Sequence, residues 1–445
     1  MHETNSTRGR QGRLYDLIPK EKRAILIGTY KSAQNKAQCE EQLAELESLG
    51  HTYGLETALK LAVPLREIDS STYIGKGKVE EIRLLMEEQQ LDLAIFDEEI
   101  SPQQQRNLEK ALKKPVIDRT ELIVGVFAQR AQSREARIQV ELAASRYQLP
   151  RLTRLWTHLS RQRTGGGGGK GGGGFLKGEG EKQIEIDRRI LRKRIDQLQA
   201  ELKEVKKHRE TQRRARIRTG IPTFAIIGYT NVGKSTLLKA LTDADVLIED
   251  KLFATLDTTT RRYTLPNRQE VLLIDTVGFI RKLPHPLVAA FKSTLEEAVQ
   301  ADILLHLIDV SSPQAVNQAA TTLDVLKELK ADKRPLITVL NKADQCTQRL
   351  MIEKMRVTYP KTVEISALKS QGLDQLLDLM IREISLLRKT VTLRIPQSHY
   401  ALVSELMREG KVNSVEYEEN DVLLEVEIPQ HLEKKVALFE VSGKT

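Results

Sequence analysis

The sequence predicts a multidomain α/β protein whose largest domain is built on a mostly parallel sheet. Three observations support this fold class. The chain has 445 residues, more than one domain normally holds. Apolar runs of strand length alternate with amphipathic stretches of helical period in two separate regions. In the second region a glycine-containing loop, 228–235, lies between an apolar run and a helical one.

The overall composition is that of a folded, water-soluble protein. Hydrophobic residues make up 40% and charged residues 29% of the chain, which excludes collagen-like and wholly disordered classes. No apolar run approaches the roughly 20 residues of a membrane-spanning helix, and the first residues lack the apolar stretch of a signal peptide. Cys39 and Cys346 give neither a disulfide framework nor metal-ligand spacing. We expect a cytoplasmic protein with no transmembrane segment.

Changes in composition predict five segments along the chain. They are a polar tail (1–21), an α/β domain (22–130), a helical hairpin (131–219), a nucleotide-binding domain (220–388) and a small α+β domain (389–445). The alternation of strands and helices begins at residue 24, and Ser101 is the expected N-cap of a helix. The last segment carries no chemical signature, so we expect packing or protein contacts from it.

The hairpin is predicted from two helical stretches that flank a glycine-rich loop. The second stretch has a heptad-like apolar seam, formed by Ile184, Leu191, Ile195, Leu198, Leu202 and Val205. The loop, 165–180, holds eleven of the 26 glycines and cannot form a packed element. We therefore expect two antiparallel helices joined by a mobile loop. Trp156 is expected in the seam, with stacking on a nucleic-acid base as the alternative.

Positive charge is concentrated in this hairpin. The whole chain has a net charge of +9, and residues 187–218 alone hold thirteen Lys/Arg against five Asp/Glu. Such an excess favours contact with nucleic-acid phosphates over the alternative, a solvated helix surface. The candidate RNA-binding residues are Lys170, Lys177, Arg188, Arg189, Arg192, Lys193 and Arg194.

Residues 228–235 match the phosphate-binding loop pattern G-x-x-x-x-G-K-[ST] between a predicted strand, 223–227, and a helix. The backbone N–H groups of such a loop face the phosphates of a nucleotide. Lys234 is expected to neutralise the β- and γ-phosphates, and Ser235 to bind Mg²⁺. The nucleotide-binding residues of this loop are Gly228, Tyr229, Thr230, Asn231, Val232, Gly233, Lys234 and Ser235.

Three further motifs follow in order, each at the end of a predicted strand. Asp275 is expected to hold Mg²⁺ through a water molecule, and the Gly278 N–H to meet the γ-phosphate. Asp344 can accept two hydrogen bonds from guanine N1–H and N2–H₂, which adenine does not offer. Backbone N–H groups near Ser366 can reach guanine O6. The residues of the three motifs are Asp275, Thr276, Val277 and Gly278; Asn341, Lys342, Ala343 and Asp344; and Ser366, Ala367 and Leu368.

Together these motifs predict a GTP- and GDP-binding domain that hydrolyses GTP. A threonine between the first two motifs should sense Mg²⁺, and four threonines in 252–260 compete for that role. Phe279 stands where many GTPases have a water-orienting glutamine, so no catalytic residue is assigned. We expect slow intrinsic hydrolysis that a partner accelerates. Asn231 is a candidate K⁺ ligand; its alternative role is to order the loop.

Several blocks resemble the HflX family of the Obg–HflX group of P-loop GTPases. They are 133–142, 147–152, the glycine-rich loop, 184–189 and 253–257. The resemblance implies that the last block is switch I, which comprises Phe253, Ala254, Thr255, Leu256 and Asp257. It also nominates Thr255 as the Mg²⁺ ligand. Thr258 replaces the proline common in the family, and Lys170 interrupts the glycine run.

The resemblance further implies a GTPase that binds the large ribosomal subunit and its RNA. Its expected roles are ribosome splitting and recycling, translation under stress, or ribosome biogenesis. The hairpin would reach ribosomal RNA and change its orientation with the bound nucleotide. We expect a monomer activated by the ribosome. The alternative is a regulatory GTPase that acts on another RNA or at a membrane surface.

Overall fold

The computed structural model describes residues 22–152, 175–218, 221–242, 252–253, 259–282, 300–347, 349–418, 420–429 and 432–441. The chain divides into two compact units. Unit 1 comprises Met1–Val205, Glu249–Asp257 and Lys282–Lys292, and unit 2 comprises Lys206–Ile248, Thr258–Arg281 and Ser293–Thr445. The polar tail, Trp156, Lys170 and Thr255 lie outside the described residues. The five domain boundaries stay predictions.

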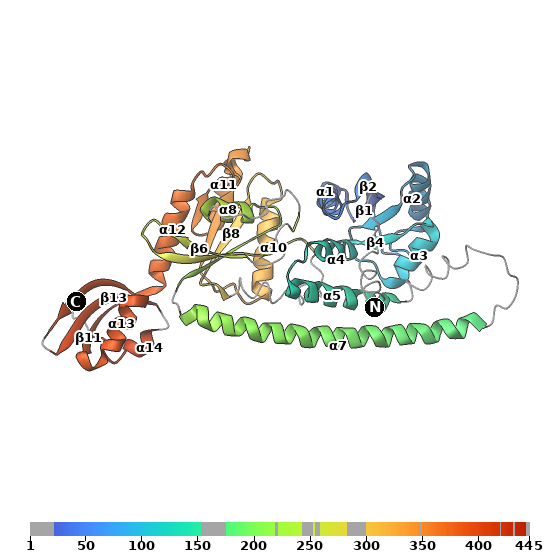
Figure 1. Cartoon of the computed structure of the whole chain (residues 1–445). Coiled ribbons are helices and arrows are strands. Elements are labelled where there is room, and N and C mark those ends of the chain that lie inside the picture. The colour runs from blue at the N-terminus through green and yellow to red at the C-terminus, as the bar shows by residue number, and fades with distance from the viewer. Residues whose placement is uncertain are drawn as a thin grey trace, which may run out of the picture. The chain divides into compact units, whose positions relative to one another are not determined.

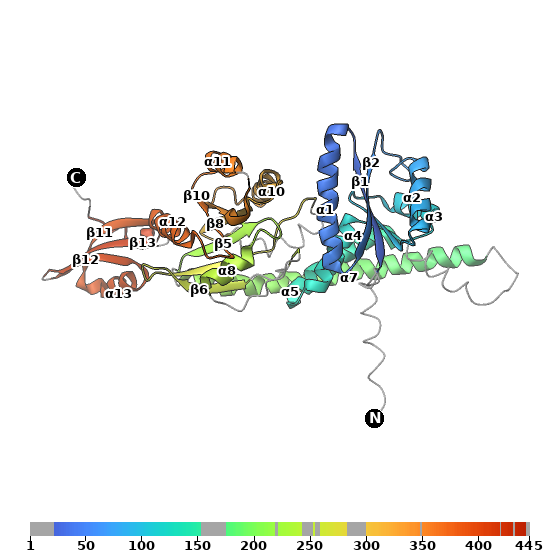
Figure 2. The same cartoon turned by 90° about the horizontal axis from the view of Figure 1, so that it is seen from above.

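Unit 1 contains a four-stranded parallel sheet in the order β2-β1-β3-β4. Its strands are β1 (Arg23–Tyr30), β2 (Glu56–Pro64), β3 (Leu93–Phe96) and β4 (Val116–Asp118). The helices are α1 (Lys36–Tyr53), α2 (Lys76–Glu88), α3 (Pro102–Leu112) and α4 (Arg119–Arg130). In Figure 2, α1 lies on one side of the sheet, and α2 and α3 lie on the other. This is the small α/β layer structure that the alternating pattern predicts.

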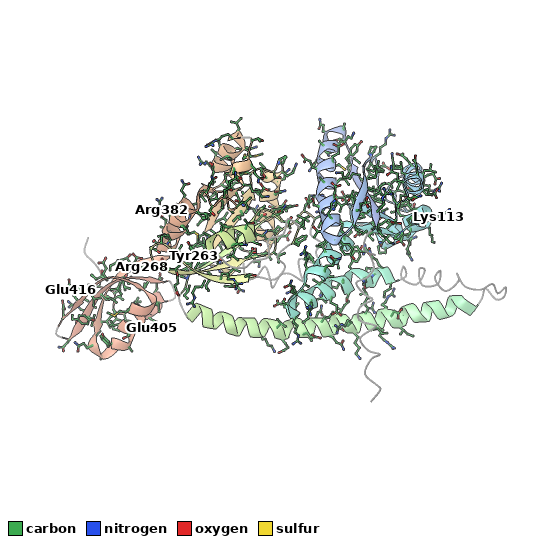
Figure 3. The ribbon with its side chains drawn as sticks, turned by 45° about the horizontal axis from the view of Figure 1, so that its top comes forward. Lys113, Tyr263, Arg268, Arg382, Glu405 and Glu416 are labelled. Carbon is green, nitrogen blue, oxygen red and sulfur yellow. The ribbon has the colours of Figure 1, made fainter. Side chains whose placement is uncertain are left out.

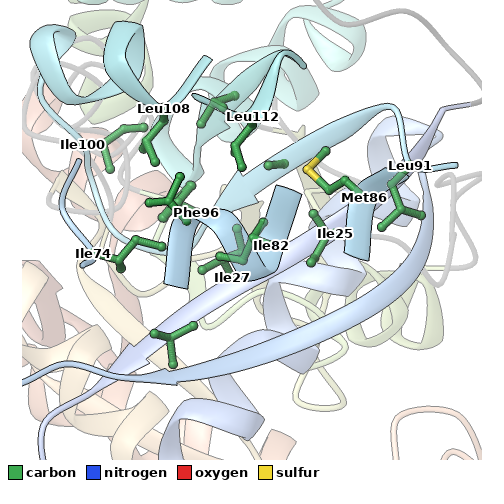
Figure 4. Close-up of a cluster of buried hydrophobic side chains, with 14 of the residues drawn as sticks. Ile25, Ile27, Ile74, Ile82, Met86, Leu91, Phe96, Ile100, Leu108 and Leu112 are labelled. Carbon is green, nitrogen blue, oxygen red and sulfur yellow. The ribbon is translucent and has the colours of Figure 1, made fainter. Parts of the chain in front are cut away.

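One core of this sheet lies under α2 and α3. Ile25 and Ile27 of β1 pack there with Ile82 and Met86 of α2 and with side chains of α3 (Figure 4). The predicted N-cap is present: the Ser101 hydroxyl accepts the Gln104 N–H at 3.2 Å, and Gln104 bonds back to Ser101 N–H. This reciprocal pair fixes where α3 begins.

The helical hairpin is antiparallel, as expected from its sequence. It consists of α5 (Arg134–Gln148), a short 3₁₀ turn at Leu149–Arg151, and α7 (Phe175–Arg218). Ile138 and Leu142 of α5 form a buried cluster with Leu198 of α7 and its neighbours on the seam. Arg194 holds Glu141 with two bonds of 2.7 and 2.9 Å.

The glycine-rich loop is shorter at one end than the sequence predicts, because α7 begins at Phe175 and residues 175–180 are therefore helical. Within this stretch Gly178 and Gly180 are separated by Glu179 and preceded by Leu176 and Lys177, which are all good helix formers. An isolated glycine costs a helix only about 1 kcal/mol relative to alanine. The dense run of consecutive glycines ends just before Phe175.

Unit 2 contains the nucleotide-domain sheet, in the order β10-β9-β8-β5-β7-β6. Figure 1 labels β6 and β8 of this sheet. The strands are β5 (Thr223–Gly228), β6 (Thr259–Thr264), β7 (Glu270–Asp275), β8 (Ile303–Asp309), β9 (Leu336–Asn341) and β10 (Thr362–Glu364). All neighbours are parallel except β6, which pairs antiparallel with β7. The described helices are α8 (Lys234–Thr242), α10 (Ala315–Glu328), α11 (Arg349–Thr358) and α12 (Leu373–Leu386).

The C-terminal segment is the small α+β fold predicted from its sequence. Its antiparallel sheet has the order β11-β13-β12, with β11 (Arg388–Pro396), β12 (Lys411–Tyr417) and β13 (Asp421–Pro429). The helices α13 (Tyr400–Glu409) and α14 (Glu433–Val436) contribute to its apolar core. Figure 3 labels Glu405 on α13 and Glu416 on β12. Across the described residues, none of the helices has the length and apolarity needed to cross a membrane.

Candidate nucleotide-binding site

The sequence motifs of unit 2 meet at one edge of its sheet. The phosphate-binding loop follows β5, Asp275 ends β7, Asn341 ends β9, and Ser366 lies just beyond β10. These strands are parallel, so their carboxyl ends lie at the same edge. After β5 the chain forms β6 and β7 on one side of that strand and then crosses to β8 on its other side, which makes β5 the switch point of the sheet. Ligands of open α/β sheets bind at this position.

Two glycines of the phosphate-binding loop are required by the backbone. Gly228 has φ +153°, and a Cβ there would lie 2.5 Å from the Leu307 carbonyl oxygen. Gly233 has φ +92°, and a Cβ there would lie 2.4 Å from Asn341 Nδ2. Between them, Asn231 has φ +61°, in the left-handed region that asparagine tolerates better than most residues. The loop can therefore curl tightly enough to turn its N–H groups toward a phosphate.

Lys234 lies at the start of α8 and is buried. Its Nζ donates to the Tyr229 carbonyl oxygen at 2.7 Å, so the ammonium spans the loop. Burial lowers the pKa of Lys234 to about 8, and the negative charge of Asp275 acts in the opposite direction. A bound phosphate would raise this pKa again by adding negative charge beside the ammonium.

A hydroxyl and a carboxylate converge beside this lysine. Ser235 Oγ donates to Asp275 Oδ2 at 2.7 Å, and Asp275 is completely buried at the end of β7. Oxygen donors of this kind fit Mg²⁺, which prefers a carboxylate and hydroxyl combined with phosphate oxygens. Two of the three residues predicted to hold Mg²⁺ are therefore brought together, and the third, Thr255, lies outside the described residues.

Gly278 approaches the phosphate-binding loop too closely for any side chain. A Cβ on Gly278 would lie 2.8 Å from Lys234 Nζ and 2.8 Å from the Thr230 Cα atom. The next residue, Phe279, exchanges backbone bonds with the loop: its N–H donates to Gly228 at 3.0 Å, and its carbonyl accepts from Thr230 at 2.7 Å. The Phe279 side chain is buried. It therefore serves packing, which explains why an apolar residue is suitable there.

The base-recognition side is organised by Asn341. Its Nδ2 donates to the Val232 carbonyl at 2.7 Å, and its Oδ1 accepts the Ala367 N–H at 3.0 Å. Asn341 thus ties the phosphate-binding loop to the Ser366–Leu368 segment. The sequence predicts that backbone N–H groups of this segment reach guanine O6. In the structure, the Ala367 N–H also has a partner within the protein, Asn341 Oδ1.

Two lysines of this region are paired with carboxylates. Lys342 has φ +58°, and its Nζ lies 2.7 Å from Asp309 Oδ2. Lys369 Nζ lies 3.1 Å from Asp344 Oδ2. Hydrogen bonds from Ser366 and Lys369 lower the pKa of Asp344, so this carboxylate is ionised and able to accept from a base. Sequence reasoning missed Lys369, although it directly follows Ser366-Ala367-Leu368.

Of the predicted switch I, 253–257, only Phe253 is described, together with the preceding Leu252; Ala254, Thr255, Leu256 and Asp257 lie outside the described residues. Both described residues are buried in unit 1. Phe253 packs edge-on against Phe127 of α4, with ring centroids 4.4 Å apart, and the Leu252 N–H donates to Thr52 Oγ1 at 3.2 Å. These contacts have no signature in the sequence, because they depend on packing between segments far apart in the chain.

Lys282, four residues after Gly278, also belongs to unit 1. Its Nζ lies 2.5 Å from Glu98 Oε1 and 3.2 Å from Asp97 Oδ2. Both carboxylates follow β3 directly. Segments from both sides of the Asp275–Gly278 motif therefore contact the N-terminal α/β domain within unit 1.

The candidate RNA-binding residues differ in their surroundings. Arg189, Arg192 and Lys193 are exposed on α7, and Arg188 is half-buried. Arg194 instead holds Glu141 within the hairpin. Lys177 lies on α7, and Lys170 is outside the described residues. The exposed cations are spaced by three and four residues, which places them on one helix face.

Comparisons with known proteins agree with this geometry. Three family models match: "GTP-binding GTPase N-terminal" at residues 40–128, "GTP-binding GTPase Middle Region" at 130–216 and "50S ribosome-binding GTPase" at 223–342. A GTPase HflX of Chlamydia pneumoniae is 50% identical over 432 residues, which cover 96% of this chain and 91% of that protein. The chain belongs to the HflX family of GTPases.

A second relative agrees with this assignment. A GTPase HflX of Escherichia coli is 40% identical over 419 residues, covering 94% of this chain and 96% of that protein. Among solved structures, a GTP-binding protein of Sulfolobus solfataricus in complex with GDP is 25% identical, with a TM-score of 0.42; the match covers 82% of this chain and 99% of that one. As a member of the HflX family, the protein binds guanine nucleotide and hydrolyses GTP.

Proposed function

We propose that this HflX-family GTPase binds RNA of the large ribosomal subunit through its hairpin, and that the bound nucleotide controls this attachment. The proposal covers roles in ribosome splitting or recycling, translation under stress, and ribosome biogenesis. It places the protein in the cytoplasm as a monomer. Its nucleotide contacts are those of the four sequence motifs and switch I.

The observation that carries the proposal is the basic face of α7, formed by Arg189, Arg192 and Lys193. These three side chains are exposed, and no carboxylate of the described residues forms an ion pair with any of them. A surface whose charge served only helix stability would pair such cations with acidic residues at i±4, as the chain does for Lys36 and Glu40. Unpaired cations on one face attract phosphates without reading a base sequence.

Nucleotide control is supported by the contacts of the switch segments within unit 1. Phe253 contacts Phe127 of α4, and Lys282 contacts Asp97 and Glu98. Thr255, the proposed Mg²⁺ ligand, is two residues from Phe253 along the chain. A change of switch I on hydrolysis would therefore act on α4.

α4 is in turn connected to the base of the hairpin. Asp118 caps the first turn of α4 by accepting the Glu121 N–H at 2.9 Å, and it also accepts the Tyr147 hydroxyl at 2.9 Å. Tyr147 belongs to α5, and Arg151 stacks on its ring at 3.8 Å while pairing with Asp118. All of these groups are buried. Displacement of α4 would therefore be transmitted to α5.

The proposed chemistry assigns one role to each group at the nucleotide. Ser235, Thr255 and Asp275 would hold Mg²⁺, Asp275 through a water molecule, and the ion would neutralise charge on the β- and γ-phosphates. Lys234 would bind the same phosphates, and Gly278 N–H the γ-phosphate. Asn231 would hold K⁺ where that ion is present. With Phe279 buried, the group that orients the attacking water would come from the ribosome, so intrinsic hydrolysis would be slow.

Sedimentation with purified ribosomal subunits tests the proposal. The full chain is centrifuged with large or small subunits in the presence of a non-hydrolysable GTP analogue, GDP or no nucleotide. We expect recovery with the large subunit that is highest with the GTP analogue. Equal recovery in all three conditions would exclude nucleotide control, and no recovery in any condition would exclude the ribosomal role.

A charge-matched pair of variants tests the basic face. Replacing Arg189, Arg192 and Lys193 with glutamine should weaken binding about tenfold or more at moderate salt and reduce its salt dependence. The control replaces Lys327, Lys333 and Arg334, three exposed cations of unit 2, with glutamine. This change removes the same amount of positive charge. Equal weakening by both triple variants would show that net charge alone attracts the ribosome.

A further inference from the structure

The loop that follows β10 is closed on itself and presents Lys369 to Asp344. Ser366 and Gln371 exchange two backbone hydrogen bonds of 3.0 and 3.1 Å, and Ser366 Oγ accepts the Lys369 N–H at 3.3 Å. Gly372 ends the loop with φ +73°, where a Cβ would lie 2.2 Å from the Glu364 carbonyl oxygen. Backbone closure therefore fixes the position from which the Lys369 side chain extends.

Asp344 is contacted by two side chains of this loop. Lys369 Nζ lies 3.1 Å from Asp344 Oδ2, and the Ser366 side chain also hydrogen-bonds the carboxylate. The Asp344 side chain is only 8% exposed, whereas that of Lys369 is 55% exposed. A carboxylate has about four lone-pair sites on its two oxygens, so it can keep these partners and still accept from guanine N1–H and N2–H₂.

We propose that Lys369 is a positioning residue for base recognition, which holds the Asp344 carboxylate in the orientation that accepts guanine. The inference concerns the guanine-binding site itself and is independent of the ribosomal role. Lys369 acts only through Asp344, so its effect is confined to bases that bond to Asp344. Adenine has no donor at those positions, so its binding should not depend on Lys369.

Charge supports the same assignment. Desolvation raises the pKa of Asp344, whereas the hydrogen bonds from Ser366 and Lys369 lower it, with a net decrease. The ammonium therefore favours the ionised carboxylate, and only that form accepts two hydrogen bonds from one base edge. Because Lys369 is more than half exposed, solvent screens its charge and the expected effect is modest.

The test measures GDP and ADP affinity by titration of the full-length protein and three variants. Lys369→Met removes the charge and keeps the chain length, Lys369→Arg restores a cation, and Lys361→Met is the control. Lys361 also pairs with a buried carboxylate, Glu383, at 2.6 Å in the same unit, away from the base loop. We expect Lys369→Met to weaken GDP binding about two- to fivefold, with ADP binding unchanged. Lys369→Arg should recover most of the loss.

A double variant identifies the route of the effect. In the Asp344→Asn background, which should bind xanthosine nucleotides in preference to guanosine nucleotides, Lys369→Met should add no further loss of GDP affinity. Tighter GDP binding by Lys369→Met would mean that the lysine competes with the base, and would overturn the proposal. Equal weakening of GDP and ADP binding would mean that Lys369 only stabilises the loop. An equal loss of GDP affinity in Lys361→Met would mean that Lys369 has no specific role in base recognition.

Discussion

At the scale of single residues, burial changes the pKa of Lys234 in the nucleotide site. Lys234 is enclosed by its own loop and donates to Tyr229, so its ammonium has little contact with water. This burial lowers its pKa to about 8. A phosphate bound here would raise this pKa again and draw a proton to the Lys234 side chain.

Proton uptake should accompany GDP binding near pH 8. In the absence of nucleotide a large fraction of Lys234 is neutral at and above its pKa, and phosphate binding raises that pKa and draws a proton. Uptake should grow between about pH 7 and pH 9, because the neutral fraction grows. Calorimetry in buffers of different ionisation enthalpy measures the protons taken up. Lys234→Ala should abolish the uptake, and a wild-type binding enthalpy independent of buffer at pH 8 would contradict this account.

Phe279 should be dispensable for ribosome-free hydrolysis. It contributes backbone bonds and apolar packing, neither of which orients water. Phe279→Leu should therefore change basal GTP turnover by less than about twofold, measured as phosphate release. Phe279→Ala should instead lower the thermal stability of unit 2, since truncating a buried phenylalanine costs about 3–5 kcal/mol. A large loss of turnover in the leucine variant at unchanged stability would give the ring a catalytic role.

At the scale of elements, the described part of the hairpin is held by an apolar seam, by the bidentate Arg194–Glu141 pair and by the longer Arg134–Glu201 pair. Leu198 is fully buried at the seam, and Arg194 reaches across from α7 to Glu141 on α5. The seam sets which faces meet. The ion pair helps to fix the register of α7 against α5, because a shift of one residue along either helix would separate Arg194 from Glu141.

The Arg194–Glu141 pair should contribute measurably to hairpin stability. Because both side chains are partly exposed, we expect a coupling energy of about 1 kcal/mol or less. A double-mutant cycle of Arg194→Ala and Glu141→Ala, read by thermal unfolding, measures it. Arg192→Ala, an exposed neighbour on α7, is the control. If Arg194→Ala costs no more than Arg192→Ala, the pair does not stabilise the hairpin.

At the scale of the whole molecule, two segments that flank the nucleotide motifs belong to unit 1, as do α5 and α7 as far as Val205. Its residues include Glu249–Asp257 and Lys282–Lys292, which belong in sequence order to the nucleotide motifs. Thr52 accepts a hydrogen bond from the Leu252 N–H, and Phe127 packs against Phe253. Asp97 and Glu98 form ion pairs with Lys282. We propose that nucleotide-dependent changes act at these contacts, outside the nucleotide site.

Removal of these contacts should uncouple ribosome binding from the nucleotide. Thr52→Val deletes the acceptor of the Leu252 N–H, and Lys282→Met deletes two ion pairs; both changes retain side-chain volume. In the combined variant, the recovery with large subunits should differ less between GTP analogue and GDP, while nucleotide affinity stays near wild type. Lys60→Met, which breaks the Lys60–Glu47 pair of unit 1, is the control. A nucleotide difference as large as in the wild type would reject the coupling.

Much of the fold follows from local sequence. Ser101 marks the start of α3, β5 lies within one residue of its predicted bounds, and the seam residues Leu191 and Leu198 are buried. Capping, side-chain periodicity and glycine density act over a few residues, so they can be read directly. The predicted glycine-rich loop extends too far, to residue 180, whereas α7 begins at Phe175. Isolated glycines among helix formers do not end a helix.

The position of the nucleotide motifs likewise follows from sequence, because each motif must place particular atoms at the end of a strand. Only the tertiary structure decided which side chains serve those atoms from a distance: Lys369 beside Asp344, Asn341 between two loops, and Phe127 beneath Phe253. These contacts join residues separated by 25 to more than 100 positions. No local pattern encodes such a contact, since it arises from packing of the complete chain.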